Sequence, residues 1–115
     1  MERRRHIRHA IEIATWLYEP RERRPLLMRS ADLSLSGVRL TWLRPLLAGT
    51  PLLVCLQLGE NGPAIECKGH VCWCALLKNG LHHFGVRFLD ITEDESQQLE
   101  EFLRVSKARP VLAAV

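Results

Sequence analysis

Hydrophobic and polar residues alternate along most of the first 90 residues, which is the pattern of half-buried β-strands. Residues 10–18 place Ile11, Ile13 and Leu17 on one face, and residues 38–42 alternate in the same way. Further strands are predicted over residues 25–33, 51–58, 64–76 and 81–89. The pattern therefore predicts about six short strands.

The later strands carry two stronger signals. Residues 51–58, PLLVCLQL, are apolar on both faces, which predicts a strand buried on two sides. Asn61-Gly62 and Asn79-Gly80 separate the last three apolar runs. An Asn-Gly pair in this position favours a type I′ hairpin, in which both central residues take a positive φ. Two such pairs predict an antiparallel meander.

A helix is predicted after Thr92, where the pattern changes. Thr92 and Glu95 form a capping box, and a narrow apolar stripe follows, made of Leu99, Phe102 and Leu103. The expected fold is thus mainly β: a six-stranded antiparallel β-barrel with a C-terminal α-helix. Closure of the barrel would remove exposed strand edges.

Length and composition fit one domain of 115 residues, 47% hydrophobic and 25% charged. We expect a flexible Arg-rich arm over residues 1–9, the barrel and helix over 10–109, and a tail over 110–115. No apolar run approaches the roughly 18 residues that span a bilayer. The basic start MERRRHIRH lacks the apolar segment of a signal peptide, so a cytoplasmic location is expected.

The four cysteines, Cys55, Cys67, Cys72 and Cys74, lie in apolar or strand-like stretches and are interpreted as reduced core residues. On an ideal strand His70, Cys72 and Cys74 would share one face. Ligands at such a spacing on one strand match no common zinc site, so no metal is expected.

Arginine is concentrated in the first quarter of the chain, although the net charge is only +3. One cluster is Arg3, Arg4, Arg5 and Arg8, and a second is Arg21, Arg23, Arg24 and Arg29. A guanidinium fork suits phosphates and base edges and can stack on a ring. The alternative is a solvated basic arm.

A second polar pattern is Asp32-x-Ser34-x-x-Gly37. On an extended backbone Asp32 and Ser34 point to the same side, about 7 Å apart. Gly37 allows a positive φ or the close approach of a ligand. The alternative is a simple turn, since all three residue types form turns.

Together the two patterns suit a guanine nucleotide. An Arg fork meets guanine O6 and N7, and a carboxylate accepts from the N1–H and the N2 amine. Guanidinium groups, the Ser34 hydroxyl and the Gly37 backbone can hold phosphates. This hypothesis requires the basic lead-in and the Asp32 segment to share one hollow.

At these motifs the sequence resembles the PilZ domain, a bacterial receptor module for cyclic di-GMP. The resemblance covers residues 2 to about 104 and includes Arg-x-x-x-Arg at Arg4 and Arg8, Asp-x-Ser-x-x-Gly at Asp32, Ser34 and Gly37, and the strand-like GVRFLD of residues 85–90. The family fold is a six-stranded antiparallel barrel with a C-terminal helix. The resemblance implies a binding-competent, non-catalytic second-messenger receptor without a cofactor.

The resemblance also implies roles for individual residues. Arg4 and Arg8 would bind guanine edges and phosphates, one of them by stacking, and Arg3 would add a contact. Asp32 and Ser34 would bind the other guanine, and Gly37 would leave room for the ligand. The role of Arg5 is less defined. Binding would order the N-terminal arm and change the surface offered to a protein partner, which the sequence does not identify.

Trp73 has two interpretations: a core or partly exposed residue, or a wall of the ligand site, because some family members place an aromatic residue on a late strand. The alternative function is a small basic barrel that binds nucleic acid. Few aromatic residues lie near the arginines, and residues 90–101 are acidic, which both argue against it. An enzyme is not favoured, because no catalytic triad, phosphate loop or metal cluster is visible.

Overall fold

The computed structural model describes all residues except 1–6, 22–23, 107–108 and 111–115. The described residues form, in chain order, β1 (His9–Ala10), β2 (Ala14–Tyr18), β3 (Leu26–Leu33), β4 (Gly37–Trp42), β5 (Pro51–Gln57), β6 (Ala64–Leu76), β7 (His82–Phe88), α1 (Glu93–Val105) and β8 (Arg109–Pro110).

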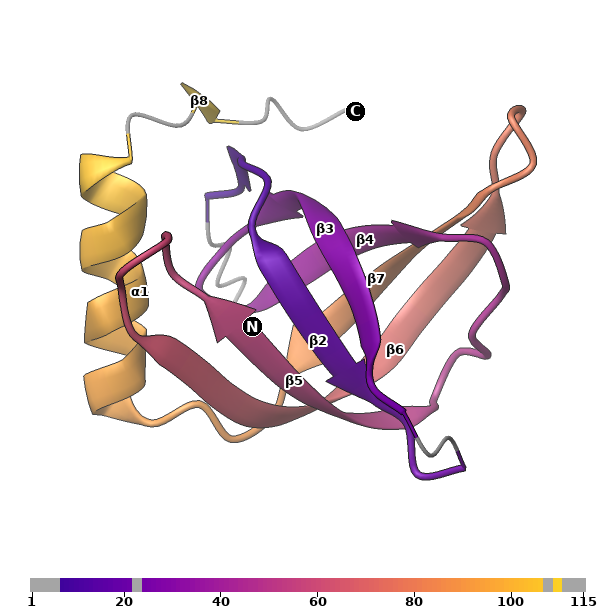
Figure 1. Cartoon of the computed structure of the whole chain (residues 1–115), viewed down its shortest axis with the longest axis horizontal. Helices are drawn as coiled ribbons and strands as arrows, with labels where there is room; N and C mark the ends of the chain where they lie inside the picture. The colour runs from indigo at the N-terminus through magenta and orange to yellow at the C-terminus, as the bar shows by residue number, and fades with distance from the viewer. Residues whose placement is uncertain (1–6, 22–23, 107–108, 111–115) are drawn as a thin grey trace, which may run out of the picture.

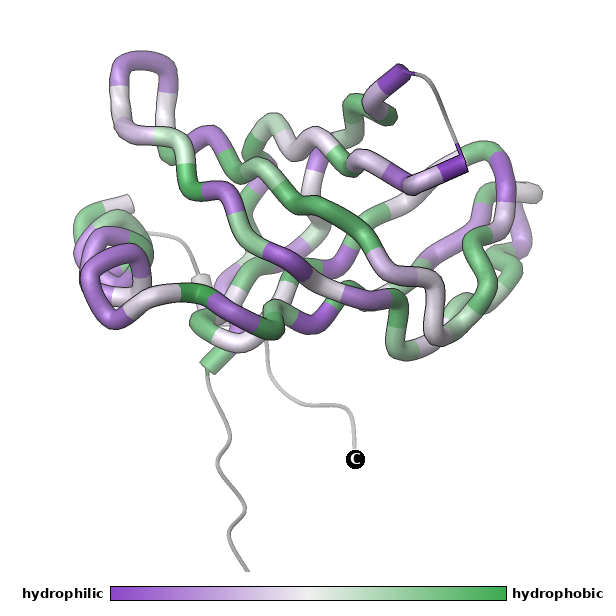
Figure 2. The backbone as a smooth tube through the Cα atoms, turned by 90° about the horizontal axis from the view of Figure 1, so that it is seen from below, coloured by the Kyte–Doolittle hydropathy of each residue, from purple (hydrophilic) through white to green (hydrophobic). Residues whose placement is uncertain are grey.

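Six of these strands close into a barrel. Antiparallel pairing runs in the order β2-β5-β6-β7-β4-β3, and β3 pairs back onto β2 (Figure 1). The short strands β1 and β8 extend the sheet from the end of β3. Hydrophobic and hydrophilic residues alternate along the strands (Figure 2), and the inward side chains, such as Leu17, Val54 and Phe84, are fully buried. The predicted six-stranded antiparallel barrel is confirmed.

Helix α1 covers one end of this barrel and begins as the sequence predicts. The backbone N–H of Glu95 donates to Thr92 Oγ1 at 3.1 Å, and the N–H of Thr92 donates to Glu95 Oε1 at 3.1 Å. Leu99 and Leu103 are buried in the common core, and Phe102 packs against it. Within the described residues, no helix is long and apolar enough to cross a membrane.

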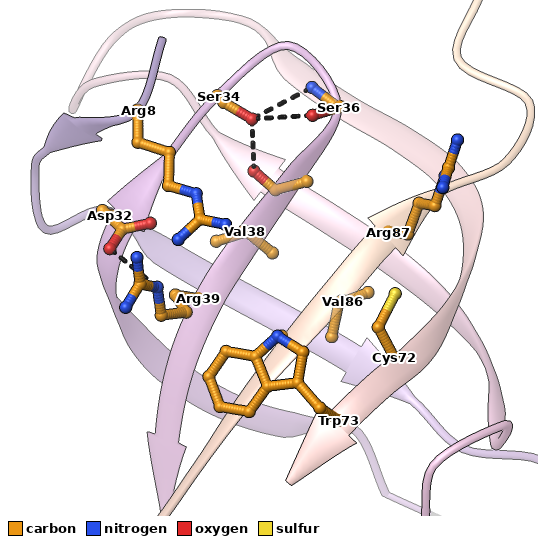
Figure 3. A pocket seen from close by; sticks show the side chains of 12 residues that line it. Arg8, Asp32, Ser34, Ser36, Val38, Arg39, Cys72, Trp73, Val86 and Arg87 are labelled. Atoms are coloured by element: carbon orange, nitrogen blue, oxygen red, sulfur yellow. Dashed lines mark hydrogen bonds and ion pairs between the residues drawn. The ribbon is translucent and has the colours of Figure 1, made fainter. Parts of the chain in front are cut away.

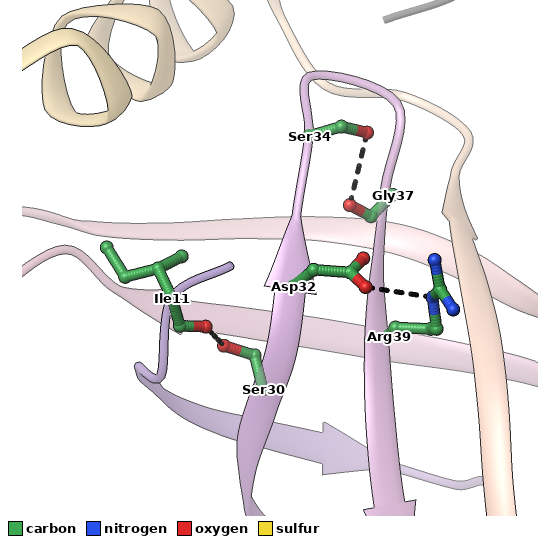
Figure 4. A network of polar contacts seen from close by, with 6 residues as sticks. All are labelled: Ile11, Ser30, Asp32, Ser34, Gly37 and Arg39. Carbon is green, nitrogen blue, oxygen red and sulfur yellow. Dashed lines mark hydrogen bonds and ion pairs between the residues drawn. The ribbon is translucent and has the colours of Figure 1, made fainter. Parts of the chain in front are cut away.

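The strand predicted over residues 10–18 is divided, which corrects the sequence-based boundary. Residues 11–13 lie between β1 and β2 and belong to neither strand. The buried side chain of Ser30 forms hydrogen bonds with the backbone of this segment. Ser30 Oγ accepts from the N–H of Ile13 at 3.0 Å and donates to the carbonyl of Ile11 at 2.5 Å (Figure 4). This hydroxyl therefore ties the N-terminal segment to β3.

Two further expectations were wrong. β5 is buried on one face only, and Leu53 is 42% exposed, because a closed barrel has a single interior. Neither Asn-Gly pair forms a two-residue type I′ turn. The first lies in the longer loop of residues 58–63, where Gly59 has the positive φ. In the second, the N–H of Gly80 donates to the carbonyl of Leu77, which closes a turn one residue earlier. The antiparallel meander β5-β6-β7 is confirmed.

Candidate functional site

A cavity of about 270 Å³ opens on the outside of the barrel over β3, β4, β7 and β6 (Figure 3). Its lining contains both polar groups and backbone from these strands, together with one residue that precedes β1. The lining residues are Arg8, Asp32, Ser34, Ser36, Gly37, Val38, Arg39, Cys72, Trp73, Gly85, Val86 and Arg87.

The fold brings the two sequence motifs to this one cavity. Arg8 immediately precedes β1, whose His9 pairs with Leu33 at the end of β3. The Ser30 hydroxyl holds the same segment a few residues further along. Of the predicted site residues, those that line the cavity are Arg8, Asp32, Ser34, Gly37 and Trp73. Arg3, Arg4 and Arg5 lie outside the described residues.

Asp32 is almost buried, with 7% of its surface exposed, and it lies directly after a register shift in β3. The shift lets Asp32 pair with Arg39 while the next residue, Leu33, turns into the core. Arg39 Nε is 2.9 Å from Asp32 Oδ2, which forms an ion pair on the cavity wall (Figure 4). Sequence analysis missed Arg39, although it occupies the outward position between the core residues Val38 and Leu40.

Ser34 shapes the hairpin between β3 and β4. Its Oγ accepts from the N–H of Ser36 at 3.1 Å and lies 3.1 Å from the Ser36 hydroxyl. The N–H of Ser34 donates to the carbonyl of Gly37 at 2.9 Å, and the N–H of Phe88 donates to the carbonyl of Ser36 at 2.9 Å. The hydroxyl therefore forms a local turn that is fastened to β7, and a role of Ser34 in ligand binding stays a prediction.

Gly37 permits a close approach, but the approaching group is the protein's own backbone. Its φ is not positive, which corrects one of the two expected reasons for a glycine. A Cβ at this position would lie 2.4 Å from the carbonyl oxygen of Val86. Gly37 thus allows β4 to pack tightly on β7 beneath the cavity.

Trp73 faces the cavity because β6 contains a second register shift. Val71 pairs with Val86, whereas Trp73 pairs with Gly85, so Cys72 is an extra residue in β6. The shift turns Trp73 outward, 37% exposed, when unbroken alternation would have placed it with the core residue Val71. A Cβ on Gly85 would lie 2.6 Å from Trp73 Nε1, so the indole rests on bare backbone. A glycine inside a strand was the available signal for this contact.

His83 supports the indole from the side. The Trp73 and His83 ring centroids are 5.2 Å apart and the rings are perpendicular. Burial lowers the pKa of His83, the positive charge of Arg39 lowers it further, and Asp32 opposes both effects in part. The neutral imidazole therefore prevails near neutral pH, and its buried Nε2 has no hydrogen-bond partner among the described residues.

The cysteines differ more than the sequence suggested. Cys67 is a core residue, and burial raises the pKa of its thiol to about 12. Cys74 also packs against the core. Cys72 is exposed and lines the cavity, which corrects its assignment to the core. Cys72 Sγ lies 3.8 Å from His70 Nε2, so these two side chains share one face. Since the extra residue at Cys72 breaks the alternation, Cys74 turns the other way and the full row of three does not form. The described residues contain no metal-binding cluster.

The charges that line the cavity favour an anion. The lining contains three guanidinium groups, those of Arg8, Arg39 and Arg87, and one carboxylate, that of Asp32. The flat indole of Trp73 lies at the same wall (Figure 3). Guanidinium and indole groups bind phosphates and the faces of planar rings, and a carboxylate accepts from base amines. These groups together can hold a phosphorylated purine.

A closed antiparallel β-barrel with a terminal helix and an arginine-lined cavity on its outer wall defines the class of small β-barrel domains. Comparison with known proteins gives the family. The chain belongs to the PilZ domain family, whose model matches residues 2–104. No functionally curated protein matches the chain by sequence.

Several solved structures share the fold. The Bacillus subtilis inhibitor of motility MotI superposes with a TM-score of 0.76 at 16% identity, over 93% of this chain and 53% of that protein. The PilZ domain of Escherichia coli YcgR, solved with c-di-GMP, gives 0.71 at 18% identity over 90% of each chain. The Klebsiella MrkH complex with c-di-GMP gives 0.70 at 20% identity, over 90% of this chain and 52% of that one. This chain thus spans about half of MotI and MrkH.

Proposed function

We propose that this chain is a non-catalytic receptor for cyclic di-GMP that acts in the bacterial cytoplasm. The observation that carries the proposal is that Arg8 and Asp32, which belong to two motifs far apart in the sequence, line one cavity. Membership of the PilZ family and the presence of c-di-GMP in the related YcgR and MrkH structures support the same ligand.

The chemistry of the cavity matches the two ends of this ligand. The Asp32 carboxylate accepts from the N1–H and N2 amine of one guanine, and the Trp73 indole offers a surface for a purine ring. Arg8 and Arg87 provide guanidinium forks for the phosphates or for guanine O6 and N7. We assign Arg3 and Arg4 to the same ligand because they lie five and four positions before Arg8 in the chain.

The output of such a receptor is a contact with a protein partner. We propose that the ligand draws the residues before Arg8 over the cavity, since the negative phosphates would neutralise arginines that otherwise repel one another. The surface around the cavity would then differ between the free and the bound chain. Partners that control motility, biofilm, exopolysaccharide or secretion are consistent with this signal.

Calorimetric titration of the full chain with cyclic di-GMP, cyclic di-AMP and GTP tests the proposal. We expect saturable binding of cyclic di-GMP and at least a tenfold preference over cyclic di-AMP. Adenine cannot donate a hydrogen bond from N1, and the loss of that bond reduces the binding free energy by roughly 1–3 kcal/mol. Asp32→Ala and Arg8→Ala should each weaken binding by about tenfold or more. Binding of all three ligands with equal affinity, or of none, would contradict the assignment.

Arg44→Ala is the matched control for the loss of one positive charge. Arg44 is exposed just beyond β4 and does not line the cavity. We expect its affinity for cyclic di-GMP to stay within about twofold of the wild type, because an exposed charge at a distance is screened by salt. If Arg44→Ala lost as much affinity as Arg8→Ala, the ligand would be attracted by the net charge of the chain alone.

A further inference from the structure

The ion pair between Asp32 and Arg39 is the most constrained charged contact at the cavity. The Asp32 side chain is 9% exposed and that of Arg39 is 24% exposed, so both charges lie largely away from water. Burial of a carboxylate with so little solvent is costly unless a positive charge lies beside it. Arg39 supplies that charge from the neighbouring strand β4, and its position belongs to neither sequence motif.

The geometry of the pair leaves the carboxylate open to other donors. Arg39 Nε lies 2.9 Å from Asp32 Oδ2, but its N–H does not meet the direction that a hydrogen bond requires. The contact is therefore mainly Coulombic. Asp32 keeps acceptor sites that can receive donors from the cavity, as the view in Figure 3 indicates.

The neighbours of Arg39 limit where its side chain can lie. In the sheet Arg39 pairs with Gly85, which in turn pairs with Trp73 on β6. The indole occupies the space over Gly85 that a side chain would otherwise fill. Arg39 is thus held between the Asp32 carboxylate on one side and the region covered by Trp73 on the other.

We propose that Arg39 is a positioning residue that holds the Asp32 carboxylate in a fixed orientation, and thereby makes the cavity selective for guanine. This inference rests on the proposed binding of cyclic di-GMP. A carboxylate fixed in this way accepts from N1–H and the N2 amine of guanine at once. A purine without the N2 amine, such as hypoxanthine, forms only one of these two bonds, and adenine forms neither.

The test compares the affinities of cyclic di-GMP and cyclic di-IMP, which differ only in the N2 amine. We expect the wild type to prefer cyclic di-GMP by about tenfold or more, the discrimination typical of one lost hydrogen bond to a charged group. Arg39→Met should reduce this preference to less than about threefold, because the carboxylate would lose its fixed orientation. Arg39→Lys keeps a positive charge and should restore part of the preference. Arg29→Met, an exposed arginine on the same strand as Asp32 that does not line the cavity, should leave it unchanged.

A double-mutant comparison separates positioning from a general effect on the fold. Once Asp32→Asn has removed the carboxylate, adding Arg39→Met should change the preference by less than about twofold, since the two residues act as a unit. Thermal unfolding of each variant verifies that it is folded at the temperature of the titration.

Each outcome has a distinct meaning. Failure of the wild type to bind cyclic di-GMP would remove the proposed function, and this inference with it. Normal binding by the wild type, together with an unchanged preference in Arg39→Met, would overturn the role of Arg39 alone. An equal loss of affinity for both ligands in Arg39→Met would also overturn it, because a general contribution of charge or stability does not distinguish the two bases.

Discussion

The barrel has two sides that differ in regularity. Strands β2 and β5, which we term the regular side, pair with their neighbours without any shift of register. The β3–β4 and β6–β7 pairs, which we term the cavity side, each contain one shift. Both shifts lie next to residues that line the cavity, Asp32 and Trp73.

This difference shows how one fold can both bury a core and place polar and aromatic side chains at a cavity. On the regular side the alternation of inward and outward residues is unbroken, so every inward side chain is buried, and all of these are apolar except Thr15. On the cavity side an extra residue re-aims the side chains that follow it. A carboxylate and an indole thereby reach the outer surface without removing Leu33 or Val71 from the core. We therefore expect the regular side to contribute mainly to stability and the cavity side mainly to binding.

Substitution of a regular-side core residue should give the largest effect on stability. Leu17 on β2 is fully buried. Leu17→Ala should lower the free energy of unfolding by about 2–5 kcal/mol, from lost apolar burial and the cavity that remains. Urea unfolding measures the loss. At urea concentrations below the unfolding transition, the affinity for cyclic di-GMP should stay within about threefold of the wild type. A loss of affinity as large as the loss of stability would remove the distinction between the two sides.

A glycine on the cavity side should affect stability and binding together. Gly37→Ala places a Cβ 2.4 Å from the Val86 carbonyl, so β4 and β7 must separate. We expect a stability loss of about 1–3 kcal/mol and weaker binding of cyclic di-GMP. Gly80→Ala is the control, because Gly80 has a φ of +88° and open space around it. It should cost about 1–2 kcal/mol through backbone strain and leave binding unchanged. Equal binding by both variants would contradict the role of Gly37.

The same contrast explains how much of the structure could be predicted from the sequence. The period-2 pattern identified the six barrel strands, and Thr92 with Glu95 identified the start of α1. These features depend on local chemistry and on a single apolar face, which a sequence displays directly. Closure of the barrel accounts for the one-sided burial of β5 that the apolar run did not reveal.

Features of the cavity side were harder to predict because they depend on pairing between distant strands. An extra residue in β6 is visible only when Val71 and Trp73 are aligned with β7. Unbroken alternation therefore placed Trp73 and Val71 on one face, and the apolar surroundings of Cys72 led to its assignment to the core. Arg39 was missed because its importance comes from the neighbouring strand that carries Asp32. The motifs identified residues that line the cavity, but not Arg39, which pairs with one of them from the neighbouring strand.

The junction between the N-terminal segment and β3 offers a second test of the cavity side. Ser30→Ala removes the hydroxyl that accepts from Ile13 N–H and donates to the Ile11 carbonyl. We expect a stability loss of about 1–3 kcal/mol, since two buried backbone groups lose a partner. Affinity for cyclic di-GMP should fall severalfold, because Arg8 lies on the released segment. Ser96→Ala on α1 is the control and should alter neither property. Unchanged affinity in Ser30→Ala would mean that Arg8 is positioned without this contact.

The smallest expected effect is a pH dependence of stability that comes from His83. Its pKa in the folded chain is below the ordinary value of about 6.5, because of burial and the charge of Arg39 on β4, with Asp32 on β3 acting in the opposite sense. As the pH falls through 6.5, the unfolded chain therefore takes up a proton before the folded chain does. The free energy of unfolding should decrease over this range and level off once the folded chain is also protonated.

Variants of two adjacent histidines isolate this contribution. Urea unfolding at pH 7.5, 6.5 and 5.5 gives the slope, to which one proton adds at most about 1.4 kcal/mol per pH unit. His83→Gln should flatten the slope relative to the wild type, while His82→Gln, the neighbouring residue on β7, should retain it. The histidines common to both variants cancel in this comparison. Because His83 contacts Trp73 and faces Arg39, a flatter slope in His83→Gln would assign the pH response to the cavity side, whereas equal slopes would assign it elsewhere in the chain.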